Sequence, residues 1–274
     1  MNPLSLNNSY TLSPDKQVSF RRDGFVCLPS VCSQSEIDVI RPQVVRMVDD
    51  AARGNEKQGR ISDYSKMFTQ VTNVWRMNET VRAFVFAKRF ARLAAELLGV
   101  KGVRLYHDQA LIKEPGGKPT PWHQDHYYWP LETDDTVTMW KPLIDCPHEM
   151  GTMDFVAGSH INPAFAEMPI SESSQEYFSR IISQQNLAPT HFSLNAGDAT
   201  FHYGKTLHSA PSNSTTIRRE VITIIYYADR TRLMQPENFN EHRKVDMEVF
   251  HPGQQPGEIA ASALNPLLWF LSER

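Results

Sequence analysis

A histidine and an aspartate stand two residues apart in the aromatic segment that runs from Pro121 to Pro130. The composition around them favours a strand, in which side chains two positions apart lie on one face. His123 and Asp125 can then point the same way from a rigid backbone. Two histidines and one carboxylate on one face of a metal make the ligand set of non-haem iron(II) sites. The pair predicts two of three ligands, although on its own a pair of this kind is more commonly a hydrogen-bonded pair in a loop.

Two later histidines, His202 and His208, could supply the third ligand. His208 is followed eleven residues later by Arg219, at the start of the apolar run from Val221 to Tyr227. A planar guanidinium binds a carboxylate through two parallel hydrogen bonds. In a strand Arg218 would lie on the opposite face, which makes it the better surface residue. This arrangement is far more specific than the His-x-Asp pair alone.

The chain resembles the phytanoyl-CoA dioxygenase family of iron(II)- and 2-oxoglutarate-dependent oxygenases. The matching pieces span most of the chain, and in order they are Asp23-Gly-Phe-Val, 109–113, Trp122-His-Gln-Asp, Trp140, Gly151, 158–160, Gly197-Asp198, His208, Asn213, Ser214 and Arg219. The resemblance implies a double-stranded β-helix, a jelly roll of the cupin kind that is mainly β with flanking helices. It also implies Fe(II) as the cofactor, with 2-oxoglutarate and O2 as cosubstrates.

The same resemblance assigns roles to individual residues. It makes His123, Asp125 and His208 the metal ligands and directs Arg219 to the far carboxylate of 2-oxoglutarate, so that His202 becomes a neighbour of the site. Further residues expected near 2-oxoglutarate are Gln109, Lys113, Thr138 and Trp140. For Lys113 a salt bridge elsewhere is an equal alternative, and Trp140 could equally be a core tryptophan. Residues that could form a substrate pocket are His126, Tyr127, Trp129 and His202.

These assignments predict oxidation of a C–H bond of a small molecule, most simply its hydroxylation, with release of succinate and CO2. Natural-product biosynthesis is one setting in which such enzymes work. Desaturation, epoxidation or rearrangement could follow from the same oxidising chemistry. Two further alternatives are a lyase or isomerase that uses another divalent metal, and a metal-binding protein of the same fold that is not an oxygenase.

Hydrophobic periodicity predicts the elements that would carry this site. Helices are expected over 15–22, after the capping-box pattern Ser33 to Glu36, over 78–98 with Asn78 as its cap and Gly99 as its end, and over 172–185. Pro42 predicts a kink or break in the second helix, and Gly54 its end. Short runs typical of strands are 25–28, 103–112, 136–144, 152–156, 190–194, 199–203 and 221–228. Residues 55–77 could be a charged surface loop or a loop over the site.

Size and composition suit one dioxygenase domain over residues 1–274. We expect a mostly helical part over 1–100, a jelly-roll core over 101–230 with an insertion at 162–189 that could act as a lid, and an extension over 231–274. A net charge of −3 without a basic run gives no support for nucleic-acid binding, and no apolar run is long enough for a membrane span. Three unpatterned cysteines and the lack of a visible secretion signal favour the cytoplasm. A homodimer remains open.

Overall fold

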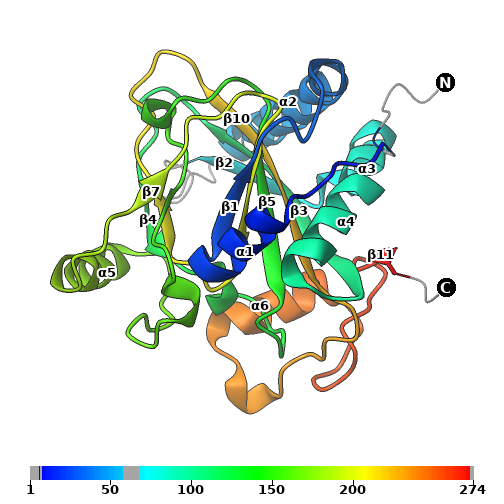
Figure 1. Ribbon diagram of the computed structural model, residues 1–274. Coiled ribbons are helices and arrows are strands. Elements are labelled where there is room, and N and C mark those ends of the chain that lie inside the picture. Colours follow the sequence, from blue (N-terminus) through cyan, green and yellow to red (C-terminus); the bar gives the residue numbers. More distant parts are fainter. Residues whose placement is uncertain (1–5, 7, 58–67, 272–274) are drawn as a thin grey trace.

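Two antiparallel sheets organise the chain in the computed structural model, which describes residues 6, 8–57 and 68–271 (Figure 1). Within these residues the larger sheet has the strand order β1-β8-β5-β10-β3-β11, with β2 also paired to β3, and the smaller has the order β4-β9-β6-β7. Residues of both sheets line one cavity, so the sheets face each other. This arrangement confirms the expected jelly-roll core with flanking helices.

The strands of the larger sheet are β1 (Phe25–Leu28), β2 (Thr69–Thr72), β3 (Gly102–Lys113), β5 (Thr136–Pro142), β8 (Ala199–Tyr203), β10 (Arg219–Ala228) and β11 (Leu267–Phe270). Those of the smaller sheet are β4 (Thr120–His123), β6 (Asp154–Phe155), β7 (Thr190–His191) and β9 (His208–Ala210). Every run predicted as a strand contains one, although β6 and β7 are only two residues long. The periodicity did not indicate β9, because a three-residue strand is too short to show an alternation.

Four helices cover the outer face of the larger sheet: α1 (Pro14–Asp23), α2 (Gln34–Lys57), α3 (Glu79–Val85) and α4 (Lys88–Leu98) (Figure 1). Their buried side chains join the outer face of the sheet in the largest hydrophobic cluster of the described residues. Helix α5 (Glu172–Gln184) lies beside β4, and α6 (Glu241–Phe250) lies at the lower end of the sheets in Figure 1. The inner faces of the sheets are thus left to enclose the cavity.

The capping box predicted before α2 is present, because the Ser33 hydroxyl accepts from the Glu36 amide and the Glu36 carboxylate accepts from the Ser33 amide. The expected break at Pro42 and end at Gly54 are wrong, since α2 continues through both. Ile40 and Val44, on either side of Pro42, are buried, so packing supports the helix there.

The single helix expected over 78–98 is two helices. Asn78 caps α3 by accepting from the amides of Thr80 and Val81, as predicted. The chain then leaves the helical conformation at Ala87, whose ψ of 122° is extended, and α4 starts anew. Gly99 ends α4 in the left-handed conformation. The apolar period did not reveal the break because the buried residues before and after it belong to the same cluster.

The segments that the sequence left undefined contribute to the larger sheet or to the cavity. Strand β2 comes from the ambiguous stretch 55–77, of which 58–67 lie outside the described residues. The C-terminal extension supplies α6 and also β11, which pairs with β3. The division of one dioxygenase domain into a helical part over 1–100, a core over 101–230 and an extension over 231–274 remains a prediction. No helix of the described residues is long and apolar enough to cross a membrane.

Candidate active site

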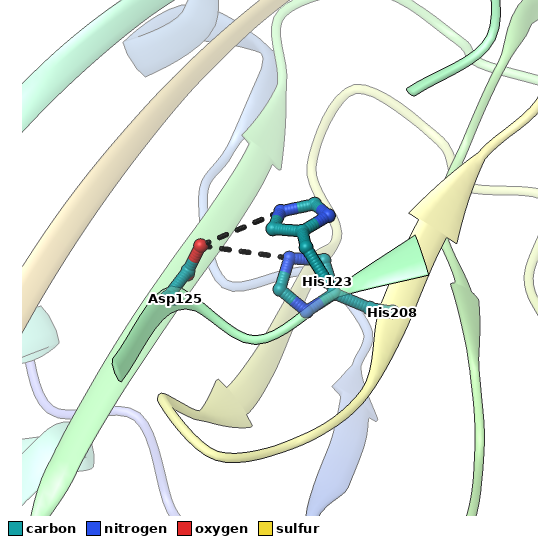
Figure 2. A group of neighbouring side chains, drawn as sticks. All are labelled: His123, Asp125 and His208. Atoms are coloured by element: carbon teal, nitrogen blue, oxygen red, sulfur yellow. Dashed lines mark ion pairs between the residues drawn. The ribbon is translucent and has the colours of Figure 1, made fainter. Parts of the chain in front are cut away.

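The ends of two short strands bring the three predicted ligands together (Figure 2). His123 ends β4, and its register partner on β9 is His208. The Asp125 Oδ1 atom lies 3.6 Å from His123 Nε2 and 3.7 Å from His208 Nε2. One ligand atom from each of the three residues lies within 4.8 Å of the others. Metal bonds to nitrogen and oxygen are about 2.0–2.2 Å, so ligands of one ion lie roughly 3–4 Å apart, a range that contains both distances from Asp125.

The expectation that His123 and Asp125 lie on one strand was wrong, although the two side chains do come together. His123 and Asp125 do not share a strand, because β4 ends at His123 and Asp125 starts the 3-10 turn η3 (Asp125–Tyr127). The amide of His126 donates to the carbonyl of Gly204, which anchors the turn. The carboxylate therefore reaches the imidazoles by a change in chain direction.

Backbone carbonyls set the orientation of both imidazoles. The Nδ1–H of His123 donates to the Pro121 carbonyl at 2.8 Å, and that of His208 donates to the Thr206 carbonyl at 2.9 Å. A proton on Nδ1 leaves the Nε2 lone pair free to face Asp125, which is the usual support for a metal-bound histidine. Burial lowers the pKa of His208 well below its usual range, so the ring is neutral, as a ligand must be.

The carboxylate is prepared for the same role. Burial opposes its charge, but His208, His123 and His202 hold the pKa of Asp125 well below its usual range. Its second oxygen accepts a hydrogen bond from the Thr138 hydroxyl at 3.1 Å, and His202 Nε2 lies 3.4 Å from the same oxygen. His202 therefore contacts the carboxylate through a different oxygen from the one that faces the other two histidines. The donor set fits a divalent metal such as iron(II).

A second group of two histidines and an aspartate lies at the paired strands β6 and β7. His148 Nε2 is 2.9 Å from Asp154 Oδ1, and His191 Nδ1 is 3.7 Å from it. The two rings stack on each other, and His191 is more than half exposed. None of the three lines the cavity. The buried group at His123 is therefore the better metal centre.

A cavity of about 480 Å³ between the sheets contains the ligand set and Arg219. Arg219 is buried, and its guanidinium lies 5.5 Å from the ring centre of Trp140. One guanidinium nitrogen donates to the Gly151 carbonyl, while Nε has no hydrogen-bond partner in the described structure. Arg218 points outward instead, to Asp49 and Glu220. The two side chains diverge as expected, although Arg218 lies just before β10, which begins at Arg219.

The Arg219 end of the cavity carries uncompensated positive charge. Burial lowers the pKa of Arg219 to about 10, so the side chain stays protonated at pH 7. Lys113 is buried beside it, and burial together with Arg219 lowers the pKa of Lys113 to about 7. Within the described residues neither forms a salt bridge, and Lys113 donates to the Pro211 carbonyl. An isolated buried cation is costly, so this end favours an anionic ligand.

Other predicted site residues divide between the cavity and its surroundings. Gln109, Thr138, Trp140, Trp129 and His202 line the cavity. Lys113 does not line it and makes no salt bridge within the described part of the chain, so neither alternative considered for it describes its position.

His126 and Tyr127 also lie outside the cavity wall, contrary to expectation. The two nitrogens of the His126 ring are instead bonded to the Glu167 carboxylate and the Thr133 carbonyl. The 3-10 turn η3 explains the difference, because it turns these side chains away while Tyr128 and Trp129 face the cavity.

Several residues that line the cavity were missed. His242, Asp246 and Phe250 project into it from α6, four residues apart. Side chains with this spacing share one face of a helix. The pattern was present in the sequence, but nothing local indicated that this helix would face the cavity. Pro169 and Ile170, from the predicted insertion 162–189, also line it, and the role of that segment as a lid stays a prediction.

Comparison with known proteins agrees with this geometry. Residues 20–221 match the family model described as phytanoyl-CoA dioxygenase (PhyH). A probable alpha-ketoglutarate-dependent hypophosphite dioxygenase from Stutzerimonas stutzeri is 26% identical over 245 residues, which cover 84% of each chain. Ectoine dioxygenase from Bordetella parapertussis is 24% identical over 247 residues, covering 82% of this chain and 79% of that protein.

Solved structures show the same fold. The alpha-ketoglutarate-dependent carbocyclase SnoK from nogalamycin biosynthesis superposes with a TM-score of 0.74 at 24% identity, covering 97% of this chain and 98% of that chain. The epimerase SnoN in complex with Fe3+, alpha-ketoglutarate and nogalamycin RO gives a TM-score of 0.73 at 26% identity, with 93% and 97% covered.

The family model covers most of the chain, so the protein belongs to the phytanoyl-CoA dioxygenase family. It is an iron(II)- and 2-oxoglutarate-dependent dioxygenase, which confirms the class and the cofactors expected from the sequence.

Proposed function

We propose that this dioxygenase hydroxylates a C–H bond of a small molecule, with His123, Asp125 and His208 as the iron ligands. One observation carries the proposal: a single buried cavity contains the complete ligand set, a buried arginine without a carboxylate partner at one end and aromatic side chains at the other. Iron, when bound, supplies the oxygen activation that couples oxidation of 2-oxoglutarate to succinate and CO2 with oxidation of the substrate.

The residues of this chain bind and orient the reactants. Arg219 binds the far carboxylate of 2-oxoglutarate through its guanidinium. The Trp140 ring packs against the guanidinium and helps to hold it in position. Thr138 keeps the second oxygen of Asp125 occupied, so that the first is directed to the metal. The buried apolar side chains of Leu111 and Met153 exclude water around 2-oxoglutarate.

A cavity of about 480 Å³ suits a substrate of small-molecule size. The names of the relatives cover several substrates and reactions, among them hypophosphite, ectoine and L-proline oxidation and steps of nogalamycin biosynthesis. A substrate from natural-product metabolism is part of our proposal. The net charge of −3 supports the absence of nucleic acid among its partners, and a homodimer is the assembly we would test first.

A cytoplasmic location also belongs to the proposal. It is supported by Cys27, Cys32 and Cys146, which are free thiols. Burial raises the pKa of each thiol to about 11, so the reactive thiolate is disfavoured. Unpaired thiols are typical of a reducing compartment.

The product distinguishes hydroxylation from the other reactions. The protein should be incubated with iron(II), 2-oxoglutarate, 18O2 and a panel that includes hypophosphite, ectoine, L-proline and polycyclic natural products, followed by mass spectrometry. We expect one panel member to gain a single 18O atom. Loss of two hydrogens, or an isomer of unchanged mass, would instead establish desaturation or rearrangement.

A further inference from the structure

The two ends of the cavity can be ordered along the larger sheet. Trp140, beneath the Arg219 guanidinium, pairs with Thr223 of β10, and two residues on, Thr138 pairs with Ile225. Thr138 contacts Asp125, so the metal centre lies one step along the sheet from the Arg219 end. On the proposed function, 2-oxoglutarate occupies the space between Arg219 and the metal. The remaining space lies beyond Ile225 and is left for the substrate.

The walls of this remaining space are mainly aromatic, and we call it the aromatic end. It is lined by His107, Tyr128, Trp129, His242, Asp246 and Phe250. The Phe250 ring stacks on His107 with 4.3 Å between ring centres. His242 meets the edge of Tyr128 at 5.0 Å. Aromatic faces carry partial negative charge and attract cations.

One carboxylate lies among these rings. Asp246 accepts a hydrogen bond from the Tyr106 hydroxyl at 2.6 Å and forms no salt bridge within the described residues. The neighbouring cations of α6 are already occupied, because Arg243 pairs with Glu167 and Lys244 with Glu241. Burial raises the pKa of Asp246 to about 7, although the Tyr106 hydrogen bond opposes this effect.

A nearly enclosed histidine lines the same end of the cavity. His107 is 3% exposed, and its Nδ1 atom is itself buried near the Asp108 backbone. Burial lowers the pKa of His107 to about 3, so the ring is neutral and cannot neutralise Asp246. The ring of His107 therefore adds a neutral aromatic wall beside Phe250, and its buried Nδ1 atom does not face the ligand.

We propose that the aromatic end binds a protonated amine of the substrate, with Asp246 as its counter-ion. The aromatic rings hold the apolar part of the same molecule and shield the ion pair from water. This inference rests on the proposed function, and it narrows the substrate to organic amines small enough to share the cavity with 2-oxoglutarate. The negative charge of bound 2-oxoglutarate is then matched by Arg219 at one end of the cavity, and the positive charge of the substrate is matched by Asp246 at the other.

The test compares amines with alcohols of the same shape. Benzylamine, 2-phenylethylamine and cyclohexylamine, each with its alcohol, are titrated by calorimetry into protein loaded with iron(II) and 2-oxoglutarate without oxygen. At least one amine should bind about tenfold or more tightly than its alcohol, the ratio expected for a buried hydrogen bond to a charged group. Asp246→Asn should reduce the preference to less than about twofold, since it removes the charge yet retains an acceptor for Tyr106.

Glu248→Gln is the matched control, because Glu248 lies on the exposed face of the same helix and does not line the cavity. It should leave the preference for amines unchanged. The inference would be overturned if the unmodified protein bound no amine more tightly than its alcohol. It would also be overturned if the preference for amines survived Asp246→Asn. Binding of 2-oxoglutarate is measured in the same samples. If the unmodified protein failed to bind 2-oxoglutarate, the result would count against the proposed function instead. The failure of the proposed function and the failure of this inference are therefore distinguishable.

Discussion

Asp125→Ala is expected to abolish oxygen-dependent turnover and to weaken iron(II) binding at least about a hundredfold, because even residues that only support metal ligands contribute about 10–100-fold. The carboxylate is the one negatively charged group of the ligand set, and both imidazoles face it at 3.6 and 3.7 Å. Without it two neutral histidines remain. Iron affinity measured by equilibrium dialysis and succinate measured by chromatography would check both effects.

Asp134→Ala is a suitable control for this variant. The Asp134 side chain is 70% exposed, pairs with Lys205 and lies 3.8 Å from the His126 ring. That ring is also held by Glu167 and the Thr133 carbonyl, so removal of Asp134 should alter neither quantity. Wild-type iron affinity and turnover in Asp125→Ala would exclude Asp125 as a ligand. His202 contacts the same carboxylate and would then be the first residue to reconsider.

Arg219→Ala is expected to weaken 2-oxoglutarate binding by about 2–5 kcal/mol, the usual effect of removing one partner of a buried charge pair, or roughly thirtyfold to several thousandfold. Iron binding should be retained, because Arg219 contacts none of the three ligands. Calorimetry with 2-oxoglutarate and iron(II) in the absence of oxygen measures this directly. Arg219→Lys should recover only part of the affinity, since an ammonium cannot make two parallel hydrogen bonds.

The adjacent arginine provides the internal comparison. Arg218 is bound to Asp49 and Glu220 at the surface, so Arg218→Ala should leave 2-oxoglutarate affinity unchanged and alter stability by about 1 kcal/mol or less. If Arg219→Ala left the affinity for 2-oxoglutarate unchanged, the assignment of the cosubstrate to this end of the cavity would be wrong. An equal loss in both variants would indicate a general effect on the fold.

Local sequence patterns were sufficient for the parts of the site that depend on neighbouring residues. His123 and Asp125 are two residues apart, although a turn rather than a strand brings them together, and the adjacent Arg218 and Arg219 side chains diverge where β10 begins. The helix cap at Asn78 and the end at Gly99 were likewise visible, because caps depend on a few adjacent residues.

Features that depend on distant contacts could not be predicted in the same way. Whether His126 faced the pocket depended on the turn at Asp125, which is anchored by the carbonyl of Gly204. The position of α6 depends on Arg243, which binds backbone carbonyls of His126 and Trp129 more than 110 residues earlier in the chain. The spacing of Asp246 and Phe250 identifies one face of a helix, but only the tertiary fold turns that face toward the cavity.

Formation of succinate tests the central claim most directly. The protein is incubated with 2-oxoglutarate and iron(II), in air and without oxygen, and with the substrate panel and without it. We predict succinate only when iron and oxygen are both present, at a rate that increases with one class of substrate. Absence of succinate under every condition, from protein that demonstrably binds iron at His123, Asp125 and His208, would contradict the assignment of this cavity as an oxygenase site.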